Sequence, residues 1–334
     1  MPKQVFAIEA ADIRCTLCSA GASILSVQVR NRRGGFTDVA LSPQSLPGGE
    51  SDPSLAGRTI GPCCGRVRDG AAVIDGRQIR LTRNENRNHL HGGLQGCASL
   101  FWTVLEHTPS GVLFRLDLPD GLDGYPGNRT LYAEYAVSGS ALRAVYSAAT
   151  DAPTWLDMTS HVYWDLSGNF DGSAMDQILQ IAASSAVYND AAHLPVSIAP
   201  ADGALDFRAP CVLSRKLADH AEHPQLNIAR GFNNAYRLDP RLQEALGFSA
   251  RLRSPHSGLC LTLQTDQPAI VLYTGGFLNE QTALRTPPGF ASPGCAVALE
   301  AQGLPDPFHL PGIAPEILRP GEAWRRETVW RFDA

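Results

Sequence analysis

Apolar and polar residues alternate with a period of two along much of this 334-residue chain. Residues 112–118 alternate cleanly, with Val112, Phe114 and Leu116 on one face of an extended segment. This period is typical of β-strands that cover a core with one face. Residues 130–137 and 141–149 repeat it on either side of Ser138-Gly139-Ser140, which predicts a hairpin. The pattern therefore favours a mostly antiparallel, all-β fold.

The rest of the chain fits the same fold class. We expect further strands at residues 24–29, 178–183, 258–264, 269–273, 295–300 and 324–332. Residues 239–247 predict a short helix, with Pro240 near its start and Gly247 at its end. No repeat, low-complexity tract or linker divides the sequence. We therefore predict one large β-sandwich domain spanning residues 1–334, with few short helices.

Composition excludes several classes of function. Hydrophobic residues make up 44% of the chain and charged residues 18%, which indicates a folded protein with a sizeable core. The formal net charge of −5 argues against nucleic acid or an anionic membrane surface as a partner. No apolar run approaches the roughly 20 residues of a membrane span, and no signal-peptide core opens the chain. We expect a cytoplasmic protein.

The eight cysteines follow no recognisable framework. Cys15 and Cys18 form a single CxxC with no second pair and no nearby histidine. Structural zinc needs more ligands than this pair supplies. Reduced, buried thiols are the expected state.

The segment SHVYWDLSG, residues 160–168, predicts a strand with one face of polar side chains that could take part in chemistry. One face would carry the apolar Val162, Trp164 and Leu166, and the other would carry Thr159, His161, Tyr163 and Asp165. His161 is either an ordinary satisfied polar residue or part of a cleft. Its polar neighbours on the same face favour the cleft.

A second candidate is Glu300, which follows the apolar run Ala296–Leu299. Such a run predicts a strand covered on both faces. A carboxyl group in that environment must be paired or must shift its pKa upward. Glu300 is therefore either half of a structural ion pair or a general base at a strand end facing a pocket.

Two further residues are weaker candidates when taken alone. His91 precedes two glycines, which would let the backbone approach a ligand closely, although a histidine in a turn would look the same. Arg66 lies among many arginines, most of which we expect on a solvated surface. One buried arginine could grip sugar hydroxyls or a carboxylate with its rigid fork. No phosphate-binding loop, serine elbow or metal-ligand spacing is present.

Taken together, these motifs resemble the aldose 1-epimerase (galactose mutarotase) family along most of the chain. The matching blocks are GRVRDG…IDG (65–76), NHLHGG (88–93), DGYPGN (123–128), SHVYWDLSG (160–168), ADGALDF (201–207), GFNNAYRL (231–238), TDQPAIVLYTGGFL (265–278), VALEAQGLPD (297–306) and LRPGEAW (318–324).

The resemblance implies a galactose mutarotase-like β-sandwich with a sugar cleft and no cofactor. By position, Glu300 matches the family's general base and His161 its general acid. His91 matches a substrate-binding histidine and Arg66 a substrate-gripping arginine. The implied activity interconverts the α and β anomers of a free aldose. The expected partner is a monosaccharide, bound by a monomer or homodimer.

Several positions depart from the family pattern. Asn233, which we retain as a substrate-binding candidate, stands where aspartate is usual. Val271 replaces a glutamine, and both Gly276 and Asp165 replace asparagines. Galactose is therefore not assured as the preferred sugar.

Three alternatives to a galactose mutarotase follow from these departures. Asn233 beside Arg66 would tolerate an anionic sugar such as a uronate, which gives a mutarotase of shifted preference. The same scaffold could also serve as a non-catalytic sugar-binding module. Asp165 and Glu300 could pair as the two carboxylates of a glycosidase.

Overall fold

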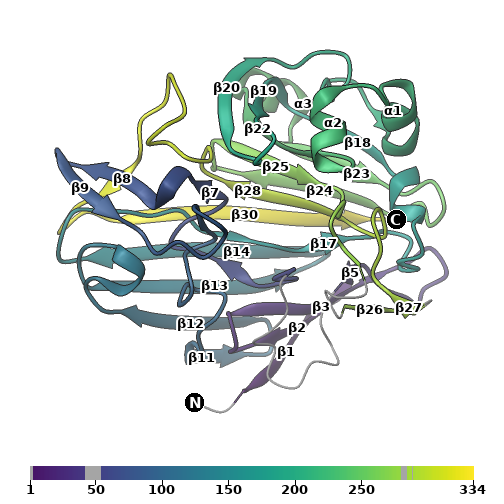
Figure 1. The fold of residues 1–334 in the computed structure, drawn as a ribbon. Coiled ribbons are helices and arrows are strands. Elements are labelled where there is room, and N and C mark those ends of the chain that lie inside the picture. The colour runs from purple at the N-terminus through teal and green to yellow at the C-terminus, as the bar shows by residue number, and fades with distance from the viewer. Residues whose placement is uncertain (1–2, 42–53, 280–283, 288) are drawn as a thin grey trace.

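The computed structural model describes residues 3–41, 54–279, 284–287 and 289–334, and its main layers are two large antiparallel sheets (Figure 1). The larger sheet has nine strands. Their order is β11 (Thr103–Thr108), β12 (Gly111–Leu118), β13 (Arg129–Ser138), β14 (Ala141–Thr150), β30 (Trp324–Asp333), β24 (Cys260–Thr265), β23 (Ala250–Arg253), β18 (Ile178–Ile181) and β21 (Cys211–Val212).

The second large sheet has seven strands and carries most of the candidate residues. Their order is β20 (Pro195–Pro200), β19 (Ala183–Asn189), β22 (Asn233–Leu238), β25 (Ala269–Tyr273), β28 (Val297–Gln302), β17 (Tyr163–Trp164) and β5 (Ala40–Leu41). A four-stranded sheet at the N-terminal end comprises β1 (Val5–Ala10), β2 (Ile13–Cys18), β3 (Ser23–Arg30) and β4 (Phe36–Asp38).

Short strand pairs and three short helices complete the described part of the chain. The pairs are β6 (Thr59–Ile60) with β16 (Thr159–Ser160), β7 (Arg66–Val67) with β10 (His89–Leu90), β8 (Ala71–Ile74) with β9 (Arg77–Arg80), β15 (Thr154–Trp155) with β29 (Ile317–Leu318), and β26 (Arg285–Thr286) with β27 (Gly289–Phe290). The helices α1 (Leu213–Asp219), α2 (Pro224–Ala229) and α3 (Pro240–Leu246) group together near β18, β22 and β23 (Figure 1). None of the described helices is long and apolar enough to cross a membrane.

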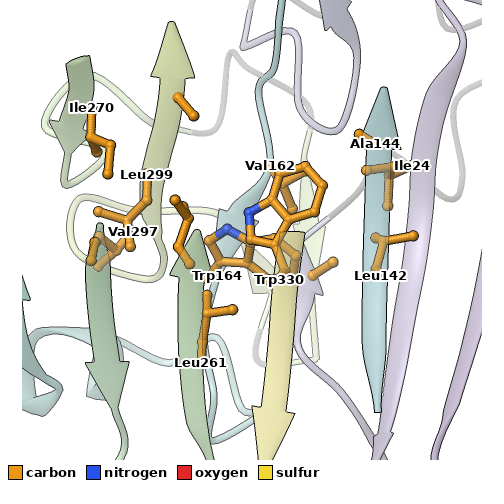
Figure 2. Packing of buried hydrophobic residues seen from close by; sticks show 14 of the residues in the cluster. Ile24, Leu142, Ala144, Val162, Trp164, Leu261, Ile270, Val297, Leu299 and Trp330 are labelled. Carbon is orange, nitrogen blue, oxygen red and sulfur yellow. The ribbon is translucent and has the colours of Figure 1, made fainter. Parts of the chain in front are cut away.

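A shared hydrophobic core joins the two large sheets. Trp330 and Leu261 from the nine-stranded sheet and Trp164 from the seven-stranded sheet belong to one cluster of buried residues (Figure 2). The rings of Trp164 and Trp330 lie 6.0 Å apart between centroids. Close packing of this kind makes the relative position of the sheets hard to change.

Alternation along β28 decides which side chains reach this core. Val297, Leu299 and Ala301 belong to the cluster between the sheets. The residues between them, Ala298 and Glu300, therefore lie on the opposite face. All six residues of β28 are buried, as the apolar run predicted, although the strand continues two residues past Glu300.

Most of the expected elements are confirmed. The hairpin forms between β13 and β14, and strands occur at the predicted places in 112–118, 258–264, 269–273 and 324–332. The helix near residue 240 is α3, which starts after Asp239, whose side chain accepts a hydrogen bond from the amide of Arg241, and ends at Gly247 in the left-handed conformation. The mostly antiparallel all-β class is therefore correct.

Two predicted strands are wrong in detail. Residues 178–183 are not one strand, because the chain leaves the nine-stranded sheet after Ile181 and enters the seven-stranded sheet at Ala183. Residues 160–168 are not one strand either, because β16 pairs with β6 whereas β17 pairs with β28 and β5. His161 lies between these two short strands. Alternation persists across both breaks, and periodicity alone cannot locate a change of partner.

Six of the eight cysteines, including Cys15 and Cys18 in β2, are buried free thiols, whereas Cys211 and Cys260 are partly exposed. The predicted burial of the CxxC pair is thus confirmed.

Replacing Leu299 with alanine tests the shared core. Leu299→Ala removes buried atoms between the two sheets and should lower the free energy of unfolding by about 2–5 kcal/mol. Leu105→Ala in β11 is the matched control, because Leu105 is 49% exposed. The control should change stability by no more than about 0.5 kcal/mol in chemical denaturation. Equal losses in both variants would contradict this core assignment.

Candidate active site

A cavity of about 540 Å³ opens on the outer face of the seven-stranded sheet. All five residues singled out from the sequence line it, and they come from five separate parts of the chain. These residues are Arg66, His91, His161, Asn233 and Glu300. The volume is that of an ordinary small-molecule site.

Glu300 is the buried acid of this cavity. Its side chain is 5% exposed, and Oε2 has no hydrogen-bond donor within reach. The nearest basic atom is Nε2 of His161, at 3.7 Å from Oε2. Burial alone raises the pKa of Glu300 to about 8. An ion pair with an arginine, the structural alternative for Glu300, is absent among the described residues.

The backbone holds His161 where the strand is interrupted. Its amide donates to the carbonyl of Arg58 at 2.9 Å, and its carbonyl accepts from the amide of Gly57 at 2.8 Å. The neighbouring loop thus replaces the strand partner that His161 lacks. Its imidazole packs on Tyr163, with ring centroids 4.9 Å apart.

Buried hydroxyl groups anchor the residue immediately before His161. Oγ of Ser160 lies within hydrogen-bond distance of the phenol oxygens of Tyr135 and Tyr146, from β13 and β14. Tyr135 also contacts Oγ1 of Thr59 at 2.8 Å. These contacts tie the His161 segment to the nine-stranded sheet across the core.

His91 is a neutral imidazole in a defined tautomer. The amide of Gly65 donates to its Nδ1 at 3.3 Å, so the ring proton resides on Nε2. Burial, with smaller contributions from nearby His161 and Arg66, holds the pKa of His91 well below its usual value. Its ring lies edge-on to His161, with centroids 5.6 Å apart. His91 is therefore a hydrogen-bond donor to whatever occupies the cavity.

Arg66 is already paired within the protein. Its Nε and Nη2 donate to the two carboxylate oxygens of Glu85 at 2.7 and 2.6 Å. Glu85 also lines the cavity. The bidentate contact fixes the plane of the guanidinium group and leaves no excess charge at this wall.

Asn233 enters the site at the start of β22. Its carbonyl accepts from Nδ2 of Asn189, whose backbone is in turn held by Gln225 from α2. Both asparagines line the cavity. The following residue, Asn234, points the other way and is buried.

Several sequence-based expectations about the site are wrong. Asp165 is 0% exposed and does not line the cavity, because it accepts hydrogen bonds from Phe170 and Ser167 in the next turn. Thr159 is likewise buried and does not line the cavity, so only His161 and Tyr163 of the expected polar face reach it. The pair of Asp165 and Glu300 that a glycosidase would need does not form.

The glycines near the site have packing roles. A side chain on Gly92 would collide with the carbonyl of Gly61, and one on Gly93 would collide with Asp123. The expectation that they bring the backbone close to a ligand is wrong. Gly276 packs against the carbonyl of Ala229 at the end of α2 and does not line the cavity. Val271, by contrast, lines it.

Some residues that line the cavity were not predicted from the sequence. Tyr273 lies two residues beyond Val271 in β25 and could have been found from that strand's alternation. His193 and Phe277 meet edge to face at the rim, and Glu85 pairs with Arg66. These last three lie in loops, where no periodic signal marks a direction.

The assembled groups suit proton transfer to and from a hydroxyl-rich ligand. A carboxyl group of raised pKa and an imidazole lie 3.7 Å apart, with donors from His91 and Arg66 on the same cavity. Within the described ranges, no three His, Cys, Asp or Glu side chains converge as metal ligands would.

The sequence is similar to those of known proteins along most of its length. Galactose mutarotase of Mus musculus is 31% identical over 330 residues, covering 98% of this chain and 93% of the relative. Galactose mutarotase of Homo sapiens is 31% identical over 332 residues, with 98% and 93% coverage. Aldose 1-epimerase of Escherichia coli (strain K12) is 29% identical over 325 residues, with 96% and 92% coverage.

Solved structures match the fold over its full length. An aldose epimerase homologue from C. elegans superimposes with a TM-score of 0.90 at 24% identity, covering 99% of both chains. Galactose 1-epimerase from Lactobacillus acidophilus gives a TM-score of 0.81 at 25% identity, covering 100% of this chain and 99% of the other. The predicted galactose mutarotase-like sandwich is therefore confirmed.

The aldose 1-epimerase family model matches residues 4–331, nearly the whole sequence. The chain therefore belongs to the aldose 1-epimerase family.

Proposed function

We propose that this protein is a mutarotase in which Glu300 and His161 interconvert the α and β anomers of a free, neutral aldose. The single observation that carries the proposal is the buried carboxyl group of Glu300, 3.7 Å from the imidazole of His161 in a cavity of suitable size. Family membership supports an isomerase of this kind.

Each step of the reaction uses a group in the cavity. Glu300, as carboxylate, takes the proton of the C1 hydroxyl while His161, as imidazolium, gives a proton to the ring oxygen. The bond between C1 and the ring oxygen breaks, and a carbonyl forms at C1. Rotation about C1–C2 and reclosure on the other carbonyl face return both protons, so the enzyme ends unchanged.

The remaining cavity residues hold the sugar. His91 donates from Nε2, and Arg66 offers the N–H groups that Glu85 does not occupy. Asn233 provides an amide that can both donate and accept. Together they hold the sugar ring in a fixed orientation relative to Glu300 and His161, and this orientation speeds the proton transfers.

The charges of the cavity favour a neutral sugar over an anionic one. The positive charge of Arg66 is offset by Glu85 at 2.6 Å, and Asn233 is uncharged. A carboxylate on the substrate would meet the carboxylate of Glu85, and the positive charge of Arg66 is already offset. The names of the curated relatives make galactose a reasonable first sugar to test.

We also propose that the chain acts as a single domain, as a monomer or homodimer in the cytoplasm. One core cluster extending from Ile8 to Phe332 supports the single domain. The free thiols support a reducing compartment.

Removing the carboxyl group should abolish most of the activity. Glu300→Gln leaves the shape of the side chain but removes the base, and kcat should fall by roughly 10²–10⁴-fold in polarimetry with fresh α-D-galactose or α-D-glucose. Glu106→Gln, at an exposed position of β11, is the control and should keep the wild-type rate.

Stability measurements show whether Glu300→Gln has lost only the base or has also lost its fold. The folded protein keeps its proton on Glu300 up to pH about 8, whereas the unfolded chain releases it near pH 4.5. Wild-type stability should therefore decrease across that window, while Glu300→Gln should not lose this contribution. A variant with full activity would refute the assigned base.

The rate should depend on pH through the same group. The mechanism needs Glu300 ionised and His161 protonated at the same time, so kcat/KM should follow a bell-shaped pH profile that falls at both acid and alkaline pH. The pKa of Glu300 is about 8, so most of its carboxyl groups are protonated below that value. Each pH unit below the pKa of Glu300 reduces the ionised fraction of its carboxyl group about tenfold. Polarimetric rates at pH 5.5–9, corrected for buffer, measure this. A kcat/KM that falls at neither end of this range would contradict it.

Substrate charge gives a further prediction. Galactose and galacturonate differ at C6 only by a carboxylate, and we expect kcat/KM to be higher for galactose by roughly tenfold or more, since one unpaired charge is worth at least that. Faster mutarotation of galacturonate would instead favour a mutarotase of acidic sugars. Tight sugar binding by calorimetry without any acceleration would favour a binding module.

A further inference from the structure

Val271 lies directly beside the acid of the cavity. In the antiparallel register of β25 and β28, Val271 is the partner of Glu300, and both residues line the cavity. Directly opposite residues on one face of a sheet have Cβ atoms about 5 Å apart. A side chain at position 271 is therefore the strand neighbour best placed to contact the carboxyl group of Glu300.

The cross-strand row on this side of Glu300 contains no donor. Ala235 in β22 is the next partner after Val271, and the two pack with Val187 in a small apolar cluster. On the other side, β17 pairs Tyr163 with Ala298, and the same register brings His161 beside Glu300. Glu300 thus has an imidazole on one side and methyl groups on the other.

Among the described residues, none of the remaining titratable groups around Glu300 donates a hydrogen bond to its Oε2. These groups are His91, Cys64, Tyr273, Tyr163 and Arg66. The pKa of His91 lies well below its usual value and that of Tyr273 is raised to about 12, both chiefly by burial, so neither side chain adds a charge beside Glu300 near pH 7. Burial also raises the pKa of the Cys64 thiol. The charge of Arg66 is taken up by Glu85.

We propose that Val271 sets the pH range in which Glu300 works as a base, because its apolar side chain withholds a hydrogen bond from the carboxylate. The inference rests on the proposed function for its kinetic consequence. Val271 is a positioning residue, since it acts only through Glu300. The raised pKa of Glu300, for which burial is the only cause, agrees with this geometry.

A glutamine at this position would act in the opposite direction. Its Nε2–H group, two carbons beyond Cβ, reaches the space that separates the two strands' side chains. A hydrogen bond to the ionised form stabilises that form and lowers the pKa of the carboxyl group. Glu300 would then be ionised, and able to act as a base, at a more acidic pH.

Three variants test the inference. Val271→Gln supplies the hydrogen-bond donor. Val271→Met places a side chain of nearly the same shape as glutamine at this position, but without a donor. Val271→Thr adds a hydroxyl with almost no change of volume and serves if the longer side chains disturb packing. On the acid side of the kcat/KM profile, Val271→Gln should be faster than Val271→Met, because lowering the pKa of Glu300 by about one unit raises its ionised fraction about tenfold. At pH 6 this difference is a gain of about tenfold.

The outcomes are distinct. Val271→Met should keep the wild-type acid limb, and Val271→Thr should shift it in the same direction as Val271→Gln by a smaller amount. Identical acid limbs for the Gln, Thr and Met variants would overturn the inference.

A second readout separates this inference from the proposed function. Glutamate labelled with ¹³C at its carboxyl carbon allows Glu300 to be titrated directly by NMR, with Glu300→Gln identifying its signal. If no sugar is turned over, the proposed function fails, yet the titration still decides the role of Val271. An unchanged midpoint in folded Val271→Gln would refute that role even in an active mutarotase.

Discussion

The site depends on a carboxyl group that is buried in β28 at the end of an apolar run. Glu300 occupies the cavity face of β28, a strand with all six residues buried, while Val297 and Leu299 on its other face build the core between the sheets. Burying such a group without a donor disfavours its charge and raises its pKa. Burial of Glu300 therefore lowers stability locally while it keeps a carboxyl group of unusual proton affinity in the cavity.

Everything else in the site is arranged around that group. His161 reaches it only because the chain breaks between β16 and β17 and borrows backbone partners from Gly57 and Arg58. The hydroxyl groups of Ser160, Tyr135 and Tyr146 then fasten this break to the opposite sheet. The distance between His161 and Glu300 is thus fixed by the packing of two sheets, which a flexible loop could not achieve.

Sequence patterns predicted a large part of the fold and of the site. Strong alternation located the long strands, and the apolar run before Glu300 indicated a doubly covered strand, which the structure confirms. Patterns failed where the chain changes partners, as at Ala183, and where a local turn captures a polar side chain, as at Asp165. They also missed Glu85, because nothing in a loop sequence indicates which way a side chain points.

The sequence by itself determined the fold class, the family resemblance and the identity of the candidate acid and base, because periodicity and residue type are local properties. Only the tertiary structure decided that Glu300 lies 3.7 Å from His161, that Glu85 neutralises Arg66, and that Val271 faces the carboxyl group. Charge balance and proton affinity depend on what surrounds a group in space. In this protein those surroundings come from strands and loops far apart in the chain.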